Sequence, residues 1–438
     1  MSVEINSEIL QKIQNNNVVV GIIGLGYVGL PLAIAFAEKG VKIIGFEQSQ
    51  TKVKNINRGE NYIKDIKDDS LKTVINKGIF KATTDFSAIK ECDALLICVP
   101  TPLDKFKKPD MSYIEASCVN VGKYMKRGVF ICLESTTYPT TTESFMLPII
   151  ERESGLTHGT DFWLAYSPER IDPGNATFRT PNTPKVLGAI TPEGLEIGKA
   201  LYEKAINHIH PVSSPRVAEM VKILENTYRL INISLINELA LLAGKMNINI
   251  WEVIEAAKTK PFGFQAFYPG PGIGGHCIPL DPFYLEHIAK IYNFDLSMIR
   301  AAGHINMRMP HYMSIKINSA LNKQKKSING SKILFLGVAY KPNIDDKRES
   351  PALAIMDEMI KKKGIVNYHD PFIPNIITHD GHALKSVELS VENISNADVV
   401  VITTKHSTYD FEMIRKHAQL IVDLQNAYSN DAENLYKL

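Results

Sequence analysis

The sequence predicts an α/β protein: two doubly wound parallel-sheet domains joined by a long central helix and a helical middle domain. Short apolar runs that end in glycine or polar residues recur in the first and last thirds of the chain, as buried parallel strands do. Helical patterns separate these runs, which is typical of crossover connections. Because 438 residues exceed what one hydrophobic core usually holds, we expect three domains, at 1–212, 213–321 and 322–438.

Composition narrows the possible partners. The chain is 45% hydrophobic and 22% charged, with a formal charge of +2 and no long block of like charge, which argues against nucleic acid or an anionic membrane as the main partner. The polar N-terminal stretch is not expected to be a signal peptide, and no run of about 18 apolar residues predicts a membrane span. Four cysteines lie in apolar or mixed segments and are expected to be reduced core thiols in a cytoplasmic protein. They are Cys92, Cys98, Cys118 and Cys132.

The first strand and turn carry a dinucleotide-binding pattern. Residues 18–26 begin as an apolar run, and Gly24, Gly26 and Gly29 form G-x-G-x-x-G before a helix with proline in its first turn. The glycines permit a tight turn and let a pyrophosphate approach the helix N-terminus, whose free N–H groups favour anions. Glu47 ends the next strand, where its carboxylate would accept from both ribose hydroxyls and repel a 2′-phosphate. The full context predicts a Rossmann-like domain that binds NAD rather than NADP.

Three further strands are expected in the first domain, at residues 92–100, 129–133 and 162–166. Each ends in polar residues, and ligands of an open parallel sheet lie at the carboxyl ends of its strands. These side chains are therefore expected to face one cleft, although each could instead cap its own loop. They are Thr101, Thr136, Glu169 and Arg170.

The middle of the chain predicts a long helix. From Pro215 onward, apolar residues recur at spacings of three and four, with no glycine or proline before Gly244. The helix would have roughly 30 residues, against an average of about 11–12. Its apolar surface is too large for one neighbour, so we expect a homodimer interface. Lys222, Asn226 and Arg229 share one face, which is either a solvated surface or part of a site.

Residues 269–282 combine four glycines and four prolines around one thiol, Cys277, with Asp281 four residues further on. Neither a helix nor a central strand tolerates this mixture, so the segment is predicted to be an ordered loop. We expect its glycines to let the backbone approach a ligand, and Cys277 to be reactive rather than a buried structural thiol. His276 and Cys277 have no second ligand pair at standard spacing, so no metal site is expected. A helix is expected at about 282–291.

A second α/β unit follows a polar linker at 322–332. An apolar run at 332–338 leads into a polar turn and a helix, and further strands are expected at 365–370, 397–405 and 420–426. The unit lacks G-x-G-x-x-G, so it need not hold a dinucleotide. Side chains suited to phosphates follow its first strand: Tyr340, Lys341 and Arg348.

Four ordered motifs together resemble the UDP-glucose/GDP-mannose dehydrogenase family, over almost the whole length of the chain. They are Gly24-Leu-Gly-Tyr-Val-Gly-Leu-Pro-Leu, Glu219-Met-Val-Lys-Ile-Leu-Glu-Asn226, Gly274-Gly-His-Cys-Ile-Pro-Leu-Asp-Pro, and Tyr340-Lys-Pro with Asp346-Lys-Arg-Glu-Ser. This family oxidises the C6 alcohol of a nucleotide sugar to a carboxylate with two NAD. The resemblance therefore implies an NAD-dependent oxidoreductase whose C-terminal domain binds a UDP-sugar.

The resemblance also implies catalytic roles that fit the chemistry of the residues. Cys277 is similar to the family's nucleophile, whose thiolate would trap the C6 aldehyde as a thiohemiacetal and leave a thioester after a second oxidation. Lys222 and Asn226 match the pair that hydrogen-bonds the C6 oxygen. Three positions match residues that orient water or transfer protons, and which of them is the base stays open. They are Asp281, Glu169 and Thr136.

Two sets of binding residues follow from the same resemblance. Contacts to NAD are expected from Gly24, Gly26, Tyr27, Val28, Gly29, Glu47, Lys52, Thr101, Thr136 and Arg348. Contacts to the nucleotide sugar are expected from Arg170, Ile171, Lys222, Asn226, Arg229, Phe267, Tyr268, Gly272, Tyr340 and Lys341. One departure is the run Asp423-Leu-Gln425-Asn426, where many relatives carry a cation, so a cationic substrate contact is missing or supplied elsewhere.

The sequence around the thiol resembles the branch of the family that acts on N-acetylhexosamines, whose products feed surface (capsular) polysaccharide synthesis. UDP-N-acetylglucosamine is the first expectation, with UDP-N-acetylmannosamine, UDP-N-acetylgalactosamine and UDP-glucose as competitors. Two other functions stay open: a two-electron dehydrogenase of a hydroxy acid or polyol, and a non-enzymatic NAD-binding sensor. The first would need no thiol, and counting NADH per substrate separates it from a four-electron enzyme.

Overall fold

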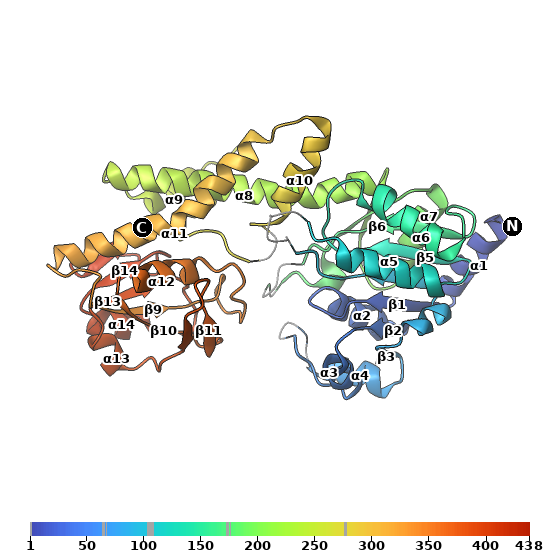
Figure 1. Cartoon of the computed structure of the whole chain (residues 1–438), viewed down its shortest axis with the longest axis horizontal. Coiled ribbons are helices and arrows are strands. Elements are labelled where there is room, and N and C mark those ends of the chain that lie inside the picture. Colours follow the sequence, from blue (N-terminus) through green and yellow to red (C-terminus); the bar gives the residue numbers. More distant parts are fainter. Residues whose placement is uncertain are drawn as a thin grey trace. The chain divides into compact units, whose positions relative to one another are not determined.

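The computed structural model describes residues 2–63, 66, 68–102, 109–171, 175, 177–275 and 278–438 (Figure 1). The chain forms two compact units, each with its own main sheet. The first comprises Met1–Glu225 and Phe283–Asn293, and the second comprises Asn226–Pro282 and Phe294–Leu438. The predicted α/β class is confirmed. Among the helices of the described residues, none is long and apolar enough to cross a membrane.

The first unit is built on an eight-stranded sheet in the order β3-β2-β1-β4-β5-β6-β7-β8. Every pair is parallel except β6 with β7. The strand order reverses direction at β1, so β1 and β4 mark the switch point at which doubly wound sheets bind ligands. The strands are β1 (Val19–Ile23), β2 (Lys42–Phe46), β3 (Phe80–Thr83), β4 (Ala94–Ile97), β5 (Val129–Leu133), β6 (Phe162–Tyr166), β7 (Lys185–Ala189) and β8 (Ile209–Val212).

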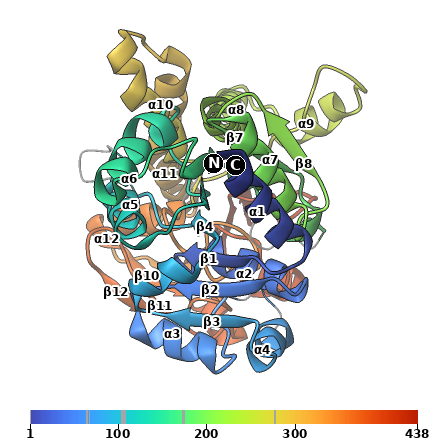
Figure 2. The same ribbon diagram turned by 90° about the vertical axis from the view of Figure 1, so that its right-hand side faces the viewer.

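Helices cover both faces of this sheet, because alternate strand residues point to opposite sides. Val20 and Ile22 of β1 pack in the cluster that includes α1, α2 and α7, whereas Val19 and Ile23 pack in the cluster that includes α5 and α6. Figure 2 shows these two helical layers on opposite sides of the strands. The helices are α1 (Ser2–Gln14), α2 (Gly29–Glu38), α3 (Gln50–Asn57), α4 (Asp68–Asn76), α5 (Ser112–Tyr124), α6 (Leu147–Ser154) and α7 (Pro192–Tyr202).

The middle of the chain is helical. Helix α8 (Pro215–Lys245) begins in the first unit and continues into the second, and its 31 residues confirm the predicted long helix. It is followed by α9 (Ile250–Lys258) and α10 (Asp281–Ala289), the second of which lies close to the predicted 282–291. The 27-residue helix α11 (Ser297–Lys323) was missed by the sequence interpretation. It contains Pro310, and proline usually ends a helix.

The second unit contains a five-stranded parallel sheet in the order β10-β9-β13-β14-β15, again with a reversal at its first strand. Its apolar layers involve α11 and α12 on one face and α13 and α14 on the other, so the predicted second α/β unit is confirmed. A small antiparallel pair, β11 and β12, was not predicted. The elements are β9 (Lys332–Leu336), α12 (Pro351–Lys361), β10 (Ile365–His369), β11 (Asn375–Ile377), β12 (Ala383–Lys385), α13 (Val391–Ser395), β13 (Val399–Ile402), α14 (Phe411–His417), β14 (Ile421–Asp423) and β15 (Leu435–Lys437).

Candidate active site

The three glycines between β1 and α2 have three different environments. Gly24 has φ +91°, and a Cβ there would lie 2.7 Å from the Cys98 carbonyl oxygen. A Cβ at Gly29 would collide with the Gly24 carbonyl oxygen, whereas Gly26 has nothing within 4 Å of the corresponding position. Packing thus requires glycine at two positions, and the third leaves open space beside the N-terminus of α2. No side chain caps that helix end, which fits an anionic ligand such as a pyrophosphate.

Glu47 lies where the ribose-binding acid is predicted. It follows β2, and its Oε2 accepts a hydrogen bond from the Leu25 backbone N–H at 3.4 Å, beside the glycine turn. The Lys52 ammonium is 3.6 Å from the same oxygen. The Tyr62 hydroxyl donates to the Leu25 carbonyl. Burial and the charge of Glu47 raise the pKa of Tyr62, so this unpredicted residue remains a donor that fixes the turn.

The ends of β4 and β5 bring two predicted residues together. The Thr101 hydroxyl donates to the Thr136 carbonyl at 2.7 Å, and Thr101 is buried. The Tyr284 hydroxyl, from α10, donates to the Thr101 carbonyl. These loops are therefore joined directly at the carboxyl edge of the sheet, close to the switch point.

The turn after β6 contacts the first part of α8. The Lys222 ammonium donates to the Glu169 carbonyl at 2.7 Å, and Lys222 is only 8% exposed, so it does not belong to a solvated face. The Glu169 carboxylate accepts from the backbone N–H groups of Arg170 and Ile171 at 2.7 and 2.8 Å. The Arg170 guanidinium binds Glu225 at 2.6 Å. The segment 169–171 is thereby fixed against the helix that carries Lys222.

A buried ion pair beneath these turns was not predicted. The Lys185 ammonium lies 2.5 Å from a Glu134 carboxylate oxygen and 3.5 Å from the Pro168 carbonyl, and the Tyr202 hydroxyl donates to Glu134. Burial alone would lower the pKa of Lys185, but the carboxylates of Glu134 and Glu169 outweigh it and raise that pKa, which favours the charged ammonium. Because Glu134 precedes Thr136 by two residues, the pair links the segments that carry Thr136 and Glu169.

In the second unit, the two predicted residues Asn226 and Asp281 are hydrogen-bonded. The Asn226 amide donates to an Asp281 carboxylate oxygen at 2.6 Å, and both side chains are buried. Asp281 is the first residue of α10. His276 and Cys277, the predicted nucleophile, lie outside the described residues.

The glycines before Cys277 are in contact with the protein itself. A Cβ at Gly274 or Gly275 would lie 2.7 or 2.8 Å from the side chain of Tyr340, and one at Gly272 would lie 3.2 Å from Pro351. The Gly275 N–H donates to the Arg348 carbonyl at 2.9 Å. Glycine is thus required here because the turn after β9 lies close to the loop, whereas the predicted approach of a ligand stays a prediction.

Three sequence profiles match the chain in order. The NAD binding domain of the UDP-glucose/GDP-mannose dehydrogenase family matches residues 18–206, its central domain matches 216–308, and its UDP binding domain matches 334–430. The chain belongs to the UDP-glucose/GDP-mannose dehydrogenase family. It is an NAD-dependent dehydrogenase of nucleotide sugars, and the glycine turn with Glu47 fits the cofactor.

Members of this family with different named substrates are similarly related to the chain. The UDP-N-acetyl-D-mannosamine dehydrogenase of Pyrococcus horikoshii is 36% identical over 93% of this chain and 95% of its own. The UDP-N-acetyl-D-glucosamine 6-dehydrogenase of Pseudomonas aeruginosa is 32% identical over 95% and 98%. The solved structure of the UDP-D-ManNAc dehydrogenase from P. horikoshii has a TM-score of 0.87 at 33% identity, covering 96% of this chain and 98% of that one.

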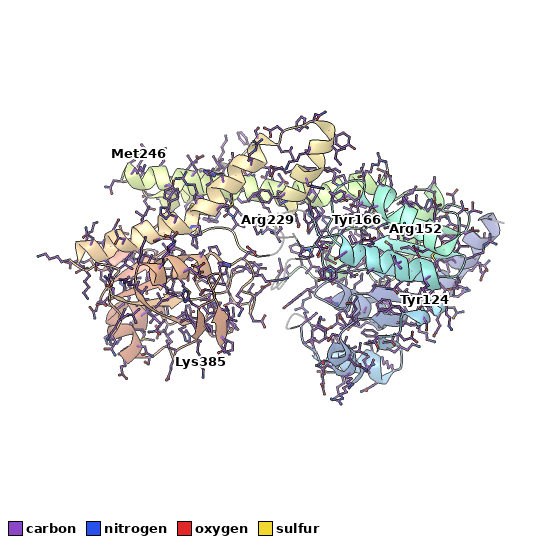
Figure 3. The ribbon with its side chains drawn as sticks, in the orientation of Figure 1. Tyr124, Arg152, Tyr166, Arg229, Met246 and Lys385 are labelled. Carbon is purple, nitrogen blue, oxygen red and sulfur yellow. The ribbon has the colours of Figure 1, made fainter. Side chains whose placement is uncertain are left out.

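The other residues predicted to bind NAD or the nucleotide sugar lie on several different elements of this dehydrogenase. Tyr268 donates to Glu255 at 2.7 Å and stacks on Trp251, whereas Phe267 packs edge-on against Tyr228. Arg229 is exposed on α8 (Figure 3). The remaining members are Tyr27 and Val28 at the start of α2, and Arg348 and Lys341 in the turn after β9, where the Arg348 guanidinium binds Asp346 at 2.6 Å.

Proposed function

We propose that the chain catalyses the NAD-dependent four-electron oxidation of the C6 alcohol of a UDP-N-acetylhexosamine to the uronic acid, with UDP-N-acetylglucosamine as the best candidate. The observation that carries the proposal is the buried Asn226–Asp281 hydrogen bond, which joins two residues assigned to the C6 oxygen and to water. Lys222 precedes Asn226 by one turn of α8. Support for the sugar comes from the relatives, whose names include dehydrogenases of both UDP-N-acetylglucosamine and UDP-N-acetylmannosamine.

The first oxidation removes a hydride from C6 and a proton from its hydroxyl. NAD, when bound, accepts the hydride. The Lys222 ammonium and Asn226 amide stabilise negative charge on the C6 oxygen, as preorganised donors do. Buried groups are suited to this task because they need no reorganisation during the reaction.

The second oxidation uses the thiol. The Cys277 thiolate adds to the aldehyde carbon and the oxygen takes up a proton, which gives a thiohemiacetal. Loss of that hydroxyl proton and of a second hydride from C6, for which a second NAD is the acceptor, leaves a thioester. Water then cleaves the C–S bond and releases the carboxylate and the thiol. Asp281, Glu169 or Thr136 directs that water, and the contact of Asp281 with Asn226 favours Asp281.

NADH counted per sugar consumed tests the four-electron reaction. We expect two NADH per UDP-N-acetylglucosamine, and Cys277→Ser should abolish uronic acid formation. One NADH per sugar in the wild-type enzyme would support a simple two-electron dehydrogenase instead. Unchanged turnover in Cys277→Ala would exclude the thioester route.

The identity of the sugar is tested separately. The values of kcat/KM are compared for UDP-N-acetylglucosamine, UDP-N-acetylmannosamine, UDP-N-acetylgalactosamine and UDP-glucose. We expect the highest value for UDP-N-acetylglucosamine. A higher value for either epimer moves the assignment to that sugar, and a higher value for UDP-glucose contradicts the N-acetylhexosamine proposal.

We also propose that α8 forms a homodimer interface with a second copy of the chain. Exposed apolar side chains recur along it at helical spacing, up to Met246 just beyond its C-terminus (Figure 3). A helix of 31 residues is about 46 Å long, and an exposed apolar stripe of that length is unusual on a monomer. Leu239→Glu should shift the molar mass measured by light scattering from dimer to monomer. The stripe comprises Val217, Met220, Leu224, Tyr228, Leu235, Leu239, Leu242 and Met246.

The domain division and the compartment are further proposals. We assign NAD binding to residues 1–212, dimerisation and the catalytic loop to 213–321, and UDP-sugar binding to 322–438, supported by the similar limits of the three family profiles. Limited proteolysis should cut near these borders. A reducing cytoplasm is supported by the four described cysteines, which are free and buried.

A further inference from the structure

The loop that leads to Cys277 is held by one side chain of α11. The Ile273 backbone N–H donates to Asn306 Oδ1 at 2.6 Å, and Asn306 Nδ2 donates to the Ile273 carbonyl at 3.4 Å. A single amide thus contacts both backbone polar groups of one residue. Such a two-point contact fixes the orientation of that peptide segment as well as its position.

Apolar packing reinforces this contact on both sides of the predicted nucleophile. Ile273 and Ile278 belong to one small cluster with Leu230 of α8 and Ala302 of α11. The Ser234 hydroxyl donates to the Ala302 carbonyl at 3.0 Å, which joins the two helices at this cluster. Ile273 and Ile278, which lie on either side of Cys277 in the sequence, therefore pack in the same cluster.

A second asparagine acts earlier in the loop. The Gly270 N–H donates to Asn237 Oδ1 at 2.9 Å, and Asn237 is wholly buried on α8. This contact lies seven residues before Cys277, whereas Ile273 lies four before it. Asn306 thus makes two hydrogen bonds to the loop backbone at a residue four positions before Cys277, where Asn237 makes one at a residue seven positions before it.

We propose that Asn306 is a positioning residue that presents the Cys277 thiol to the C6 aldehyde by fixing the backbone at Ile273. This inference rests on the proposed role of Cys277 as nucleophile. Asn306 acts through the loop and does not itself touch the reacting atoms. Its removal affects capture of the aldehyde more than the first hydride transfer, which needs no thiol.

The test compares Asn306→Ala with Asn306→Asp and with Asn318→Ala, an exposed asparagine on the same helix. We expect Asn306→Ala to lower kcat by about 10- to 100-fold, the range that a misplacement of about 1 Å produces, with the KM for NAD unchanged. NADH per sugar falls below two, and free aldehyde is trapped by hydroxylamine. Asn306→Asp keeps the acceptor of the short bond and recovers part of the rate. Asn318→Ala behaves as wild type.

Thiol reactivity provides a second readout. The rate at which iodoacetamide alkylates Cys277 should differ between Asn306→Ala and the wild type, and UDP-sugar should protect the thiol less well in the variant. The four buried cysteines should react little and so give a low background. If Asn306→Ala does not fold, Asn306→Gln displaces the same amide by one methylene and should show the same loss of stoichiometry. A variant with lower Tm but two NADH per sugar and wild-type alkylation overturns the proposal. One NADH per sugar in the wild type would instead overturn the thioester route itself.

Discussion

Burial and hydrogen bonding have opposite effects on the pKa of Glu219, and the net effect can be measured as a pH dependence of stability. Glu219 lies near the start of α8 with its side chain wholly buried. Its carboxylate accepts from the Thr140 and Thr142 backbone N–H groups at 2.6 and 2.9 Å and from the Thr142 hydroxyl at 2.7 Å. Burial raises the pKa of Glu219 from 4.5 to about 7, against the three donors, which lower it.

The sign of the effect on stability follows from this shift. A carboxyl with a higher pKa in the folded than in the unfolded state binds its proton more tightly when folded. Its contribution to the free energy of unfolding is therefore fully present below pH 4.5 and is lost as the pH rises through about 7. The shift corresponds to roughly 3 kcal/mol over that window.

Denaturant unfolding from pH 5 to 8 tests this value in the wild type and in Glu219→Gln. Trp163 is in the first unit and Trp251 in the second, so a Trp251→Phe background makes fluorescence report the unit that contains Glu219. We expect the stability of the wild type relative to Glu219→Gln to fall by most of that amount as the pH rises. Glu38→Gln, an exposed control, should give a constant difference. A difference that stays flat, or that grows in favour of the wild type, would refute the reasoning.

Three shorter predictions concern the same unit. Thr140 has φ +88°, where a β-branched residue is strained, so Thr140→Gly should raise the free energy of unfolding by about 1 kcal/mol in a denaturant titration. Lys185→Met should lower the free energy of unfolding by about 3–5 kcal/mol, because the Glu134 carboxylate stays buried without its cation. The double variant Lys185→Met/Glu134→Gln should recover part of the loss, measured as a higher Tm than that of Lys185→Met alone. Glu47→Ser should raise the KM for NAD about tenfold, because the ribose hydroxyls lose their acceptor. The ratio of kcat/KM for NAD to kcat/KM for NADP should fall, because the charge that repels a 2′-phosphate is removed.

Features that depend on neighbouring residues in the sequence were predictable. The glycine turn, α2 and Glu47 lie within 30 residues, and the spacing of strand, turn, helix and acid determines them together. The periodicity of α8 is likewise local. The fold class followed because both sheets are built from such strand–helix units.

Contacts between distant residues were not predictable in the same way. Glu134 and Lys185 are 51 positions apart, and nothing near either residue indicates that the charges meet in the core. The loop glycines were expected to approach a ligand, but only the fold reveals that Tyr340 lies against them. The hydrogen bonds between Asn306 and Ile273 join residues 33 positions apart. They depend on α11, which was not predicted because it contains Pro310.

The two sheets use the same turn after their first strand. Gly24 and Gly337 both have positive φ, at +91° and +84°, and each donates its N–H to the last residue of the neighbouring strand, at Phe46 and His369. In each unit the next residue along the chain is an acid, Glu47 or Asp370. Each acid accepts from the backbone just after its glycine.

What differs is how much of each acid remains available. The Asp370 side chain is wholly buried: its Oδ2 accepts from Val338, Ala339 and His406, and its Oδ1 accepts from the backbone N–H groups of Phe372 and Ile373, so both oxygens are occupied by donors of the protein. Glu47 accepts from the Leu25 N–H at 3.4 Å and from the Ser49 N–H at 3.1 Å, and Lys52 lies 3.6 Å away, but its side chain is partly exposed and nothing lies within 4 Å of a Cβ position at Gly26. In the second sheet, Ala339 stands two positions after the glycine, where the first has Gly26. The same turn therefore leaves space at Gly26 and a partly exposed acid, Glu47, for a dinucleotide in the first domain. In the second domain Ala339 replaces that glycine, and Asp370 is fully used in holding the turn that carries Tyr340 and Lys341.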